Sequence, residues 1–131
     1  MTPQREEAAR LLRLARQDQA ACSALLGAPG VAVAVAFFHA QQAVEKALKA
    51  VMCLRGLEYR RTHDLEELAG QLADANCQPA VGEAELRLLT PYAVEYRYDD
   101  EAPELLAPAQ ALAIVAAVLA WADGQTSLGS A

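Results

Sequence analysis

The chain has 131 residues, a typical length for one domain, and contains 30 alanines and 19 leucines, both strong helix formers. This composition excludes intrinsic disorder of the whole chain and argues against an all-β sandwich. The net charge of −6 argues against a protein that coats duplex nucleic acid, because such proteins carry a basic surface.

A first helix is predicted to begin at Pro3. Thr2 can cap it, proline is favoured at the first helical position, and Glu6 and Glu7 suit the positive end of the helix dipole. Its apolar face consists of Ala8, Leu11, Ala15, Cys22 and Leu25. Glycines and a proline at 27–30 end the helix.

A second helix is predicted over residues 31–55. The alternation in VAVAVA at 31–36 would also suit a strand, but it continues without a breaker into a clearly helical segment. The core face consists of Phe37, Ala40, Val44, Ala47, Val51 and Leu54. A second stripe consists of Phe38, Gln42, Glu45 and Lys49, and its last two residues have the spacing of a favourable ion pair.

Two shorter helices follow. Asp64 can cap a third helix, and Glu67 lies three residues later, which is the spacing of a capping box. A fourth helix is predicted over 83–98, with a kink near Pro91 because proline removes a backbone hydrogen bond. Its inner face consists of Leu86, Leu89, Ala93 and Tyr96.

A fifth helix is predicted over residues 103–122. Residues 105–122 are uncharged and nearly long enough to span a membrane, but many are Ala, Pro or Gln and the flanks are acidic. We therefore expect a helix buried in a bundle or at a subunit interface. The sequence is interpreted as all-α, an antiparallel up-and-down bundle of four to five helices over 1–124 with a flexible tail at 125–131.

The sequence predicts a cytoplasmic protein without a disulfide framework, metal centre or required cofactor. Its three cysteines are an odd number without CxxC spacing, and the Glu-x-x-His pairs of metal sites in helical bundles are absent. The N-terminal sequence MTPQREEAARLL has no apolar signal core. No membrane contact is expected.

Polar residues of the second helix have two interpretations. His39 and Lys46 lie seven residues apart on a similar face, beside Gln42, Glu45 and Lys49. Such a stripe can line a ligand groove. Solvated faces of amphipathic helices usually have the same composition, so this structural interpretation stands beside the functional one.

Two basic segments are also open to both interpretations. The loop GLEYRRTHDL places Arg60, Arg61 and His63 at the start of the third helix, where anions such as phosphate are favoured. The acidic residues there compete for the same amides, and His63 can simply support the cap. Arg97, which is flanked by tyrosines, can hold a phosphate, stack on a base, or form a structural ion pair.

Three sequence blocks resemble the HEPN domain family (higher eukaryotes and prokaryotes nucleotide-binding), in its small stand-alone bacterial or archaeal form. The blocks are FFHAQQAVEKALKAVM at 37–52, THDL at 62–65 and YxxxYRYDDEAPE at 92–104. Their order and separation also match, and the likeness covers about residues 5–122. The first block is the most specific.

The resemblance implies a helical bundle that is frequently a homodimer and is often paired with a small nucleotidyltransferase in a toxin–antitoxin-like system. Some members are thought to bind nucleotides. Others are metal-independent ribonucleases that use an arginine followed, after four to six residues, by a histidine. This chain departs from that motif, because no histidine follows Arg97, and the RYP of the family is RYD here.

We therefore expect a non-catalytic subunit that dimerises and binds a nucleotide such as ATP or GTP, a nucleotidyltransferase partner, or both. RNA is a less favoured ligand. The alternatives are a divergent metal-independent ribonuclease and a purely structural interaction module. No catalytic residue is assigned, and the candidate nucleotide- or anion-binding residues are Arg97, Tyr98, His63, Lys46, Lys49 and Gln42.

Overall fold

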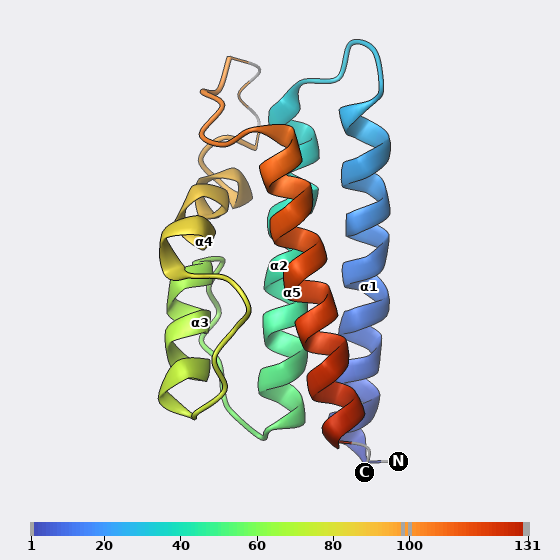
Figure 1. Ribbon diagram of the computed structural model, residues 1–131. Coiled ribbons are helices and arrows are strands. Elements are labelled where there is room, and N and C mark those ends of the chain that lie inside the picture. The colour runs from blue at the N-terminus through green and yellow to red at the C-terminus, as the bar shows by residue number, and fades with distance from the viewer. Residues whose placement is uncertain (1, 98, 100, 130–131) are drawn as a thin grey trace.

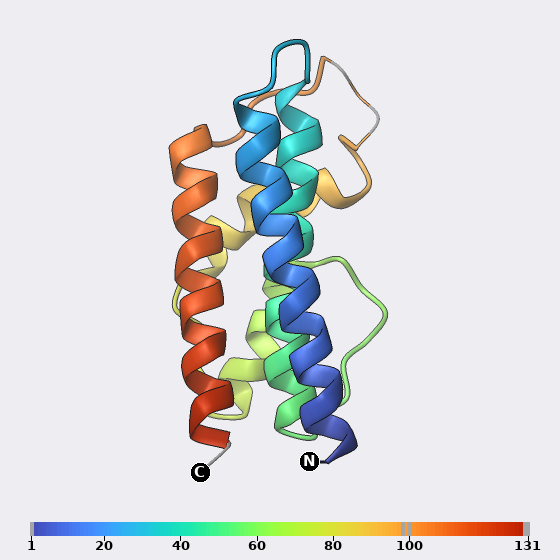
Figure 2. The ribbon, with the colours of Figure 1, turned by 90° about the vertical axis from the view of Figure 1, so that its right-hand side faces the viewer.

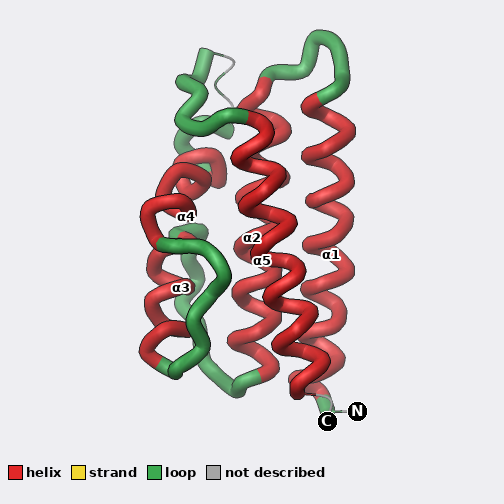
Figure 3. The backbone as a smooth tube through the Cα atoms, viewed as in Figure 1, coloured by secondary structure: helices red, strands yellow, loops and turns green. Residues whose placement is uncertain are grey.

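The computed structural model describes residues 2–97, 99 and 101–129 and shows helices joined by loops (Figures 1 and 3). No strand occurs within those ranges. The elements are α1 (Pro3–Leu26), α2 (Val33–Leu54), α3 (Leu65–Asp74), α4 (Glu83–Leu89), the 3-10 helix η1 (Thr90–Ala93) and α5 (Pro108–Gly129). The prediction of an all-α helical bundle is confirmed.

α2 is the central helix of the bundle. It packs against α1 and α5 and also contacts α3, α4 and η1. The three long helices stand side by side, and the short helices α3 and α4 form a further column next to them (Figures 1 and 2). Because α4 and η1 carry the chain back to the end where α2 begins, α5 runs in the same direction as α2 (Figure 1).

The core is built from the apolar faces predicted for the first two helices. On α1, four of the five predicted residues are buried, and Leu25 is half-buried. On α2, every predicted core residue is fully buried except the half-buried Leu54. Small side chains let the neighbouring helices approach α2 closely. The buried alanines of α2 are Ala34, Ala36, Ala40, Ala43, Ala47 and Ala50.

Predicted capping residues set several helix ends. Thr2 Oγ1 accepts the N–H of Arg5 at 3.2 Å, and Asp64 Oδ1 accepts the N–H of Glu67 at 3.2 Å. α2 ends before Gly56, whose φ of +69° is a left-handed conformation that few other residues adopt readily. These three ends therefore follow from local sequence chemistry.

The fourth helix is shorter than predicted. α4 ends at Leu89 and gives way to η1, because Pro91 has no N–H with which to continue the helical ladder. The predicted kink is thus a helix end. Beyond it, the buried Tyr92 hydroxyl donates to the Pro103 carbonyl at 2.7 Å and accepts the Leu105 N–H at 3.0 Å. These bonds tie the segment before α5 to η1.

The fifth helix lies later in the chain than predicted. α5 begins at Pro108 and continues to Gly129, so residues 125–129 of the predicted tail are helical. A tertiary contact supports the last turns, since the Arg55 guanidinium donates to Gln125 Oε1 at 3.0 Å. The flexibility of that segment stays a prediction. In the part of the chain that the structure describes, no helix combines the length and apolarity needed to cross a membrane.

Candidate functional site

The polar residues of α2 form one strip along the helix, which we call the α2 strip. It consists of partly exposed residues, namely the aromatic Phe38 and its neighbours His39, Gln42, Lys46, Lys49 and Cys53. Beside the strip, the side chains of Gln41 and Glu45 are buried. The interpretation of a simply solvated face therefore does not hold for Glu45, whose side chain is only 7 % exposed.

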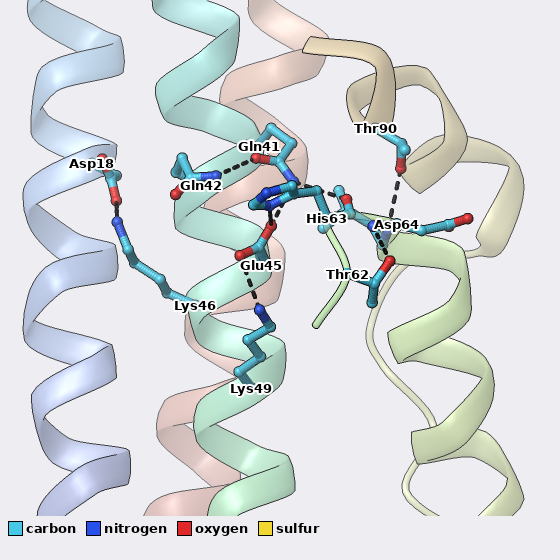
Figure 4. Close-up of polar contacts among 11 residues, drawn as sticks. Asp18, Gln41, Gln42, Glu45, Lys46, Lys49, Thr62, His63, Asp64 and Thr90 are labelled. Atoms are coloured by element: carbon cyan, nitrogen blue, oxygen red, sulfur yellow. Dashed lines mark hydrogen bonds and ion pairs between the residues drawn. The ribbon is translucent and has the colours of Figure 1, made fainter. Parts of the chain in front are cut away.

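Glu45 is the centre of a partly buried hydrogen-bond network (Figure 4). Its Oε1 accepts Gln41 Nε2 at 3.0 Å and faces His63 Nδ1 at 2.7 Å, and its Oε2 accepts Lys49 Nζ at 3.1 Å. Because an ionised carboxylate only accepts hydrogen bonds, we assign the His63 proton to Nδ1. The other ring nitrogen, Nε2, is then left for a further partner.

Gln41 connects this network to the loop that precedes α3. Its side chain is fully buried, and its Nε2 also donates to the main-chain carbonyl of His63 at 3.0 Å. Its Oε1 accepts Gln42 Nε2 at 2.7 Å. The amide of Gln41 thus fixes the position of His63 relative to α2, since both polar ends of this amide are used.

A second carboxylate, Asp18 of α1, makes an equivalent pair of contacts on the other side of the strip. Its Oδ1 lies 2.9 Å from His39 Nδ1, and its Oδ2 accepts Lys46 Nζ at 2.5 Å. The Asp18 side chain is 11 % exposed, whereas the His39 side chain is 30 % exposed. Each side of the strip therefore has one buried carboxylate that holds one histidine and one lysine.

A cation lies against an aromatic ring near each end of the strip. The guanidinium carbon of Arg97 lies 4.2 Å from the centre of the Phe38 ring, and Lys49 Nζ lies 5.2 Å from the centre of the Tyr59 ring. Such contacts stabilise a cation by about 0.5–1 kcal/mol at exposed sites. Arg97, far from α2 in sequence, is thereby brought to the strip.

The start of α3 is satisfied from within the protein. Besides the Asp64 cap, Thr90 Oγ1 accepts the N–H of Leu65 at 3.2 Å and donates to Glu66 Oε1 at 2.6 Å. Burial, reinforced by the neighbouring Asp64, raises the pKa of the Glu66 carboxyl. Arg60 pairs with Glu67 at 3.4 Å. These contacts support the structural interpretation of the helix start rather than an anion site on its amides.

The structure brings together five of the six predicted site residues. Gln42, Lys46 and Lys49 lie on the strip, His63 is bonded to the network beside it, and Arg97 covers Phe38. Tyr98 lies outside the described residues. Within the described ranges, no three metal-ligating side chains converge.

Sequence reasoning missed two residues that organise this site, Asp18 and Gln41. A signal for both was present in the sequence. Asp18 lies at helical spacing from Ala15 and Cys22, on the apolar face of α1, and Gln41 lies at the same kind of spacing from Phe37 and core neighbours on α2. A polar residue in a core position requires a partner, because burial without a hydrogen bond is costly.

The comparisons with known proteins identify the family. The sequence matches the HEPN domain over residues 5–125, which includes the α2 strip and the residues that contact it. Neither the curated proteins nor the solved structures that were compared with it contain a significant match. Since the matched region covers most of the 131 residues, the chain belongs to the HEPN domain family.

Proposed function

We propose that this protein is a non-catalytic HEPN subunit that binds a nucleotide or another phosphate-bearing ligand on the α2 strip. The observation that carries the proposal is the convergence on that strip of basic side chains from three segments. Lys46 and Lys49 come from α2, His63 comes from the loop before α3, and Arg97 comes from the segment after η1. This local group contrasts with the net charge of −6 on the whole chain.

Thermal melts with ATP, GTP and a short RNA, at matched ionic strength, test this proposal. A ligand present at one hundred times its dissociation constant stabilises the folded state by about 2.7 kcal/mol. We expect one of these ligands to raise the Tm of the wild type and to have a much smaller effect on Arg97→Ala. Arg13→Ala, which removes an exposed arginine from α1, is the matched control. Equal shifts in all three proteins would contradict a site that includes Arg97.

We further propose that the subunit forms a homodimer through α5 and acts with a small nucleotidyltransferase partner. The outward face of α5 supports the interface because its side chains between residues 109 and 120 are short or uncharged, and the charged residue near its C-terminal end, Asp123, is paired with Arg16. Its exposed residues between 109 and 124 are Ala109, Gln110, Ala113, Ala116, Ala120 and Gly124. A contiguous exposed surface of largely apolar residues is typical of a helix that packs against another subunit.

The dimer is tested by placing a charge on that face. Ala116→Arg is expected to convert the dimer to a monomer by light scattering, because a buried unpaired charge is costly at an interface. Helix content should be unchanged, since Ala116 is exposed in the single chain. Ala20→Arg, at an exposed alanine of α1, should leave the mass unchanged. A monomeric wild type at high concentration, alone and with the partner, would exclude the interface.

A second candidate function is a divergent ribonuclease. The observation in its favour is that each histidine of the chain is held by a buried carboxylate through Nδ1. A carboxylate that orients a histidine is a common arrangement for general acid–base catalysis. Structured and unstructured RNA, incubated with and without divalent metal, tests this function. Intact RNA in all conditions would exclude it, whereas cleavage abolished by His63→Gln would support it.

A further inference from the structure

The Arg97 guanidinium is held against the ring of Phe38, and both residues are anchored to the core. The guanidinium carbon lies 4.2 Å from the centre of the Phe38 ring, which belongs to the central helix α2. Next to Arg97 in the chain, the centre of the Tyr96 ring lies 5.5 Å from that of the buried Tyr92 ring. Tyr92 in turn meets the buried Phe37 ring at 5.1 Å. The segment that carries Arg97 is therefore fixed relative to α2.

Arg97 and Phe38 together form a flat group at one end of the α2 strip, which we call the Arg97 platform. Arg97 is exposed, whereas Phe38 is half-buried, so the ring supports the guanidinium from the side of the protein. A guanidinium is planar and stacks on aromatic rings, including those of nucleobases. An arginine side chain that is already held in place loses less conformational entropy when a ligand binds to it.

The residues around the Arg97 platform are apolar. α2 has no Asp, Glu, Lys or Arg between residues 33 and 44. Val35, which lies one helical turn before the platform ring, is 39 % exposed, and Val94, three residues before Arg97, is 67 % exposed. A phosphate placed against such side chains loses hydration without gaining a partner, whereas a flat aromatic group gains apolar contact.

The charges next to Arg97 in the chain also disfavour a phosphate on the platform. Glu95 and Asp99 are exposed and lie two residues before and two residues after Arg97. Their Cα atoms are within about 8 Å of that of Arg97, because consecutive Cα atoms are about 3.8 Å apart. The two carboxylates offset the guanidinium charge that an approaching phosphate meets. An uncharged base is not repelled by them.

We infer that the Arg97 platform stacks an aromatic base, so that the ligand of the α2 strip is a nucleotide and not an anion made of phosphate alone. This inference rests on the proposed function, since it assigns the two ends of the same site. The flat face of Arg97 contacts the base, and Phe38 positions that face. Lys46 and Lys49 hold the phosphate end of the ligand.

A continuous series of contacts joins the two ends of this site. The centre of the Phe38 ring lies 5.3 Å from that of the His39 ring, and His39 Nδ1 lies 2.9 Å from Asp18 Oδ1. Lys46 Nζ donates to the other oxygen of the same carboxylate at 2.5 Å (Figure 4). Phe38 and Lys46 are about 12 Å apart along the helix axis. The shared carboxylate brings the Lys46 ammonium close to the His39 ring, so one ligand with a base and a phosphate on the same ribose can contact both ends.

Isothermal titration calorimetry of the full chain compares ATP with inorganic triphosphate, which has a phosphate chain but no base. The titrations are made at pH 7 and matched ionic strength, without divalent metal. Stacking of one base changes a dissociation constant by about 5- to 150-fold. We therefore expect the wild type to bind ATP at least about fivefold more tightly than triphosphate.

The Phe38→Leu/Arg97→Lys variant separates the flat surface from the charge. It keeps a positive charge at position 97 and an apolar side chain at position 38, but it has no planar group at either. We expect its affinity for ATP to fall at least about fivefold and its affinity for triphosphate to change less than about twofold. Arg97→Lys alone should show part or all of the same loss. Arg13→Lys, at an exposed position of α1, is the matched control and should bind both ligands like the wild type.

Three results would overturn the inference while leaving the proposed phosphate binding intact. The first is equal affinity of the wild type for ATP and triphosphate, and the second is unchanged ATP affinity in the double variant. The third is an equal loss of both ligands in that variant, because Arg97 would then act on the phosphate chain. Absence of binding of ATP, triphosphate and a short RNA would overturn the proposed function itself.

A short single-stranded RNA without a terminal phosphate distinguishes two sources of the base. Tighter binding of this RNA than of ATP, weakened in the double variant, would identify the bases of a strand as the natural ligand of the platform. Circular dichroism checks the folding of every variant. If the double variant is unfolded, nuclear Overhauser contacts in the wild type between the base protons of bound ATP and Phe38 or Arg97 decide the question, and their absence would overturn the inference.

Discussion

Truncation of Phe37 to alanine is expected to lower the free energy of unfolding by about 3–5 kcal/mol. The ring is completely buried in α2 and meets the buried ring of Tyr92 edge-on, with centroids 5.1 Å apart. The variant therefore loses apolar burial and an aromatic contact and leaves a cavity next to η1. Urea denaturation monitored by circular dichroism measures the difference.

The adjacent Phe38 provides the matched control. Its side chain is half-exposed and lies under Arg97, so Phe38→Ala removes much less buried surface and should cost clearly less than Phe37→Ala. An equal or larger loss of stability for Phe38→Ala would mean that α2 is rotated relative to the bundle described above. The pair thus tests which face of α2 forms the core.

Replacement of Glu45 by alanine is expected to cost about 2–3 kcal/mol of stability. The change removes an acceptor shared by Gln41, His63 and Lys49. One N–H of the buried Gln41 amide and the largely buried ammonium of Lys49 then lose their acceptor. Removing one member of a fully buried pair costs about 3–5 kcal/mol. We expect less here, because the side chain of Lys49 is 15 % exposed and can turn toward water.

The control for this prediction is Glu85→Ala. Glu85 is an exposed residue of α4, and surface substitutions of that kind usually change stability by no more than about 0.5 kcal/mol. Chemical denaturation of both variants at pH 7 gives the comparison. If Glu45→Ala were as stable as Glu85→Ala, the network around Glu45 would make no net contribution to folding.

Local chemistry made the helices and most of their core faces predictable. Caps such as Thr2 and Asp64 act through their own side chains on nearby amides, and the period of apolar residues follows from helix geometry. The end of α4 was harder to predict, since a proline within an apolar pattern can either kink a helix or end it. The extension of α5 beyond residue 122 was also missed, and the contact that Gln125 makes there is with Arg55, which is distant in sequence.

The candidate site was only partly predictable for the same reason. Helical spacing predicts that Lys46, Lys49 and Gln42 share one side of α2. The contact of Arg97 with Phe38, in contrast, depends on the path of the chain after η1. The roles of Asp18 and Gln41 depend on packing between different segments. Asp18 meets α2 across the α1–α2 interface, and Gln41 meets the carbonyl of His63 across a loop. A single sequence indicates that such buried polar residues need partners, but not which partners they find.

The arrangement of the three long helices also constrains how the protein matures during its synthesis. α1 and α2 are neighbours in sequence and can pair as a hairpin early. Besides α1 and the short helices, α2 also packs against α5, which follows the other described elements in the chain. Until α5 has left the ribosome, the nascent chain carries an uncovered apolar surface that can attract chaperones or other nascent chains. Completion of the fold is therefore tied to the synthesis of α5.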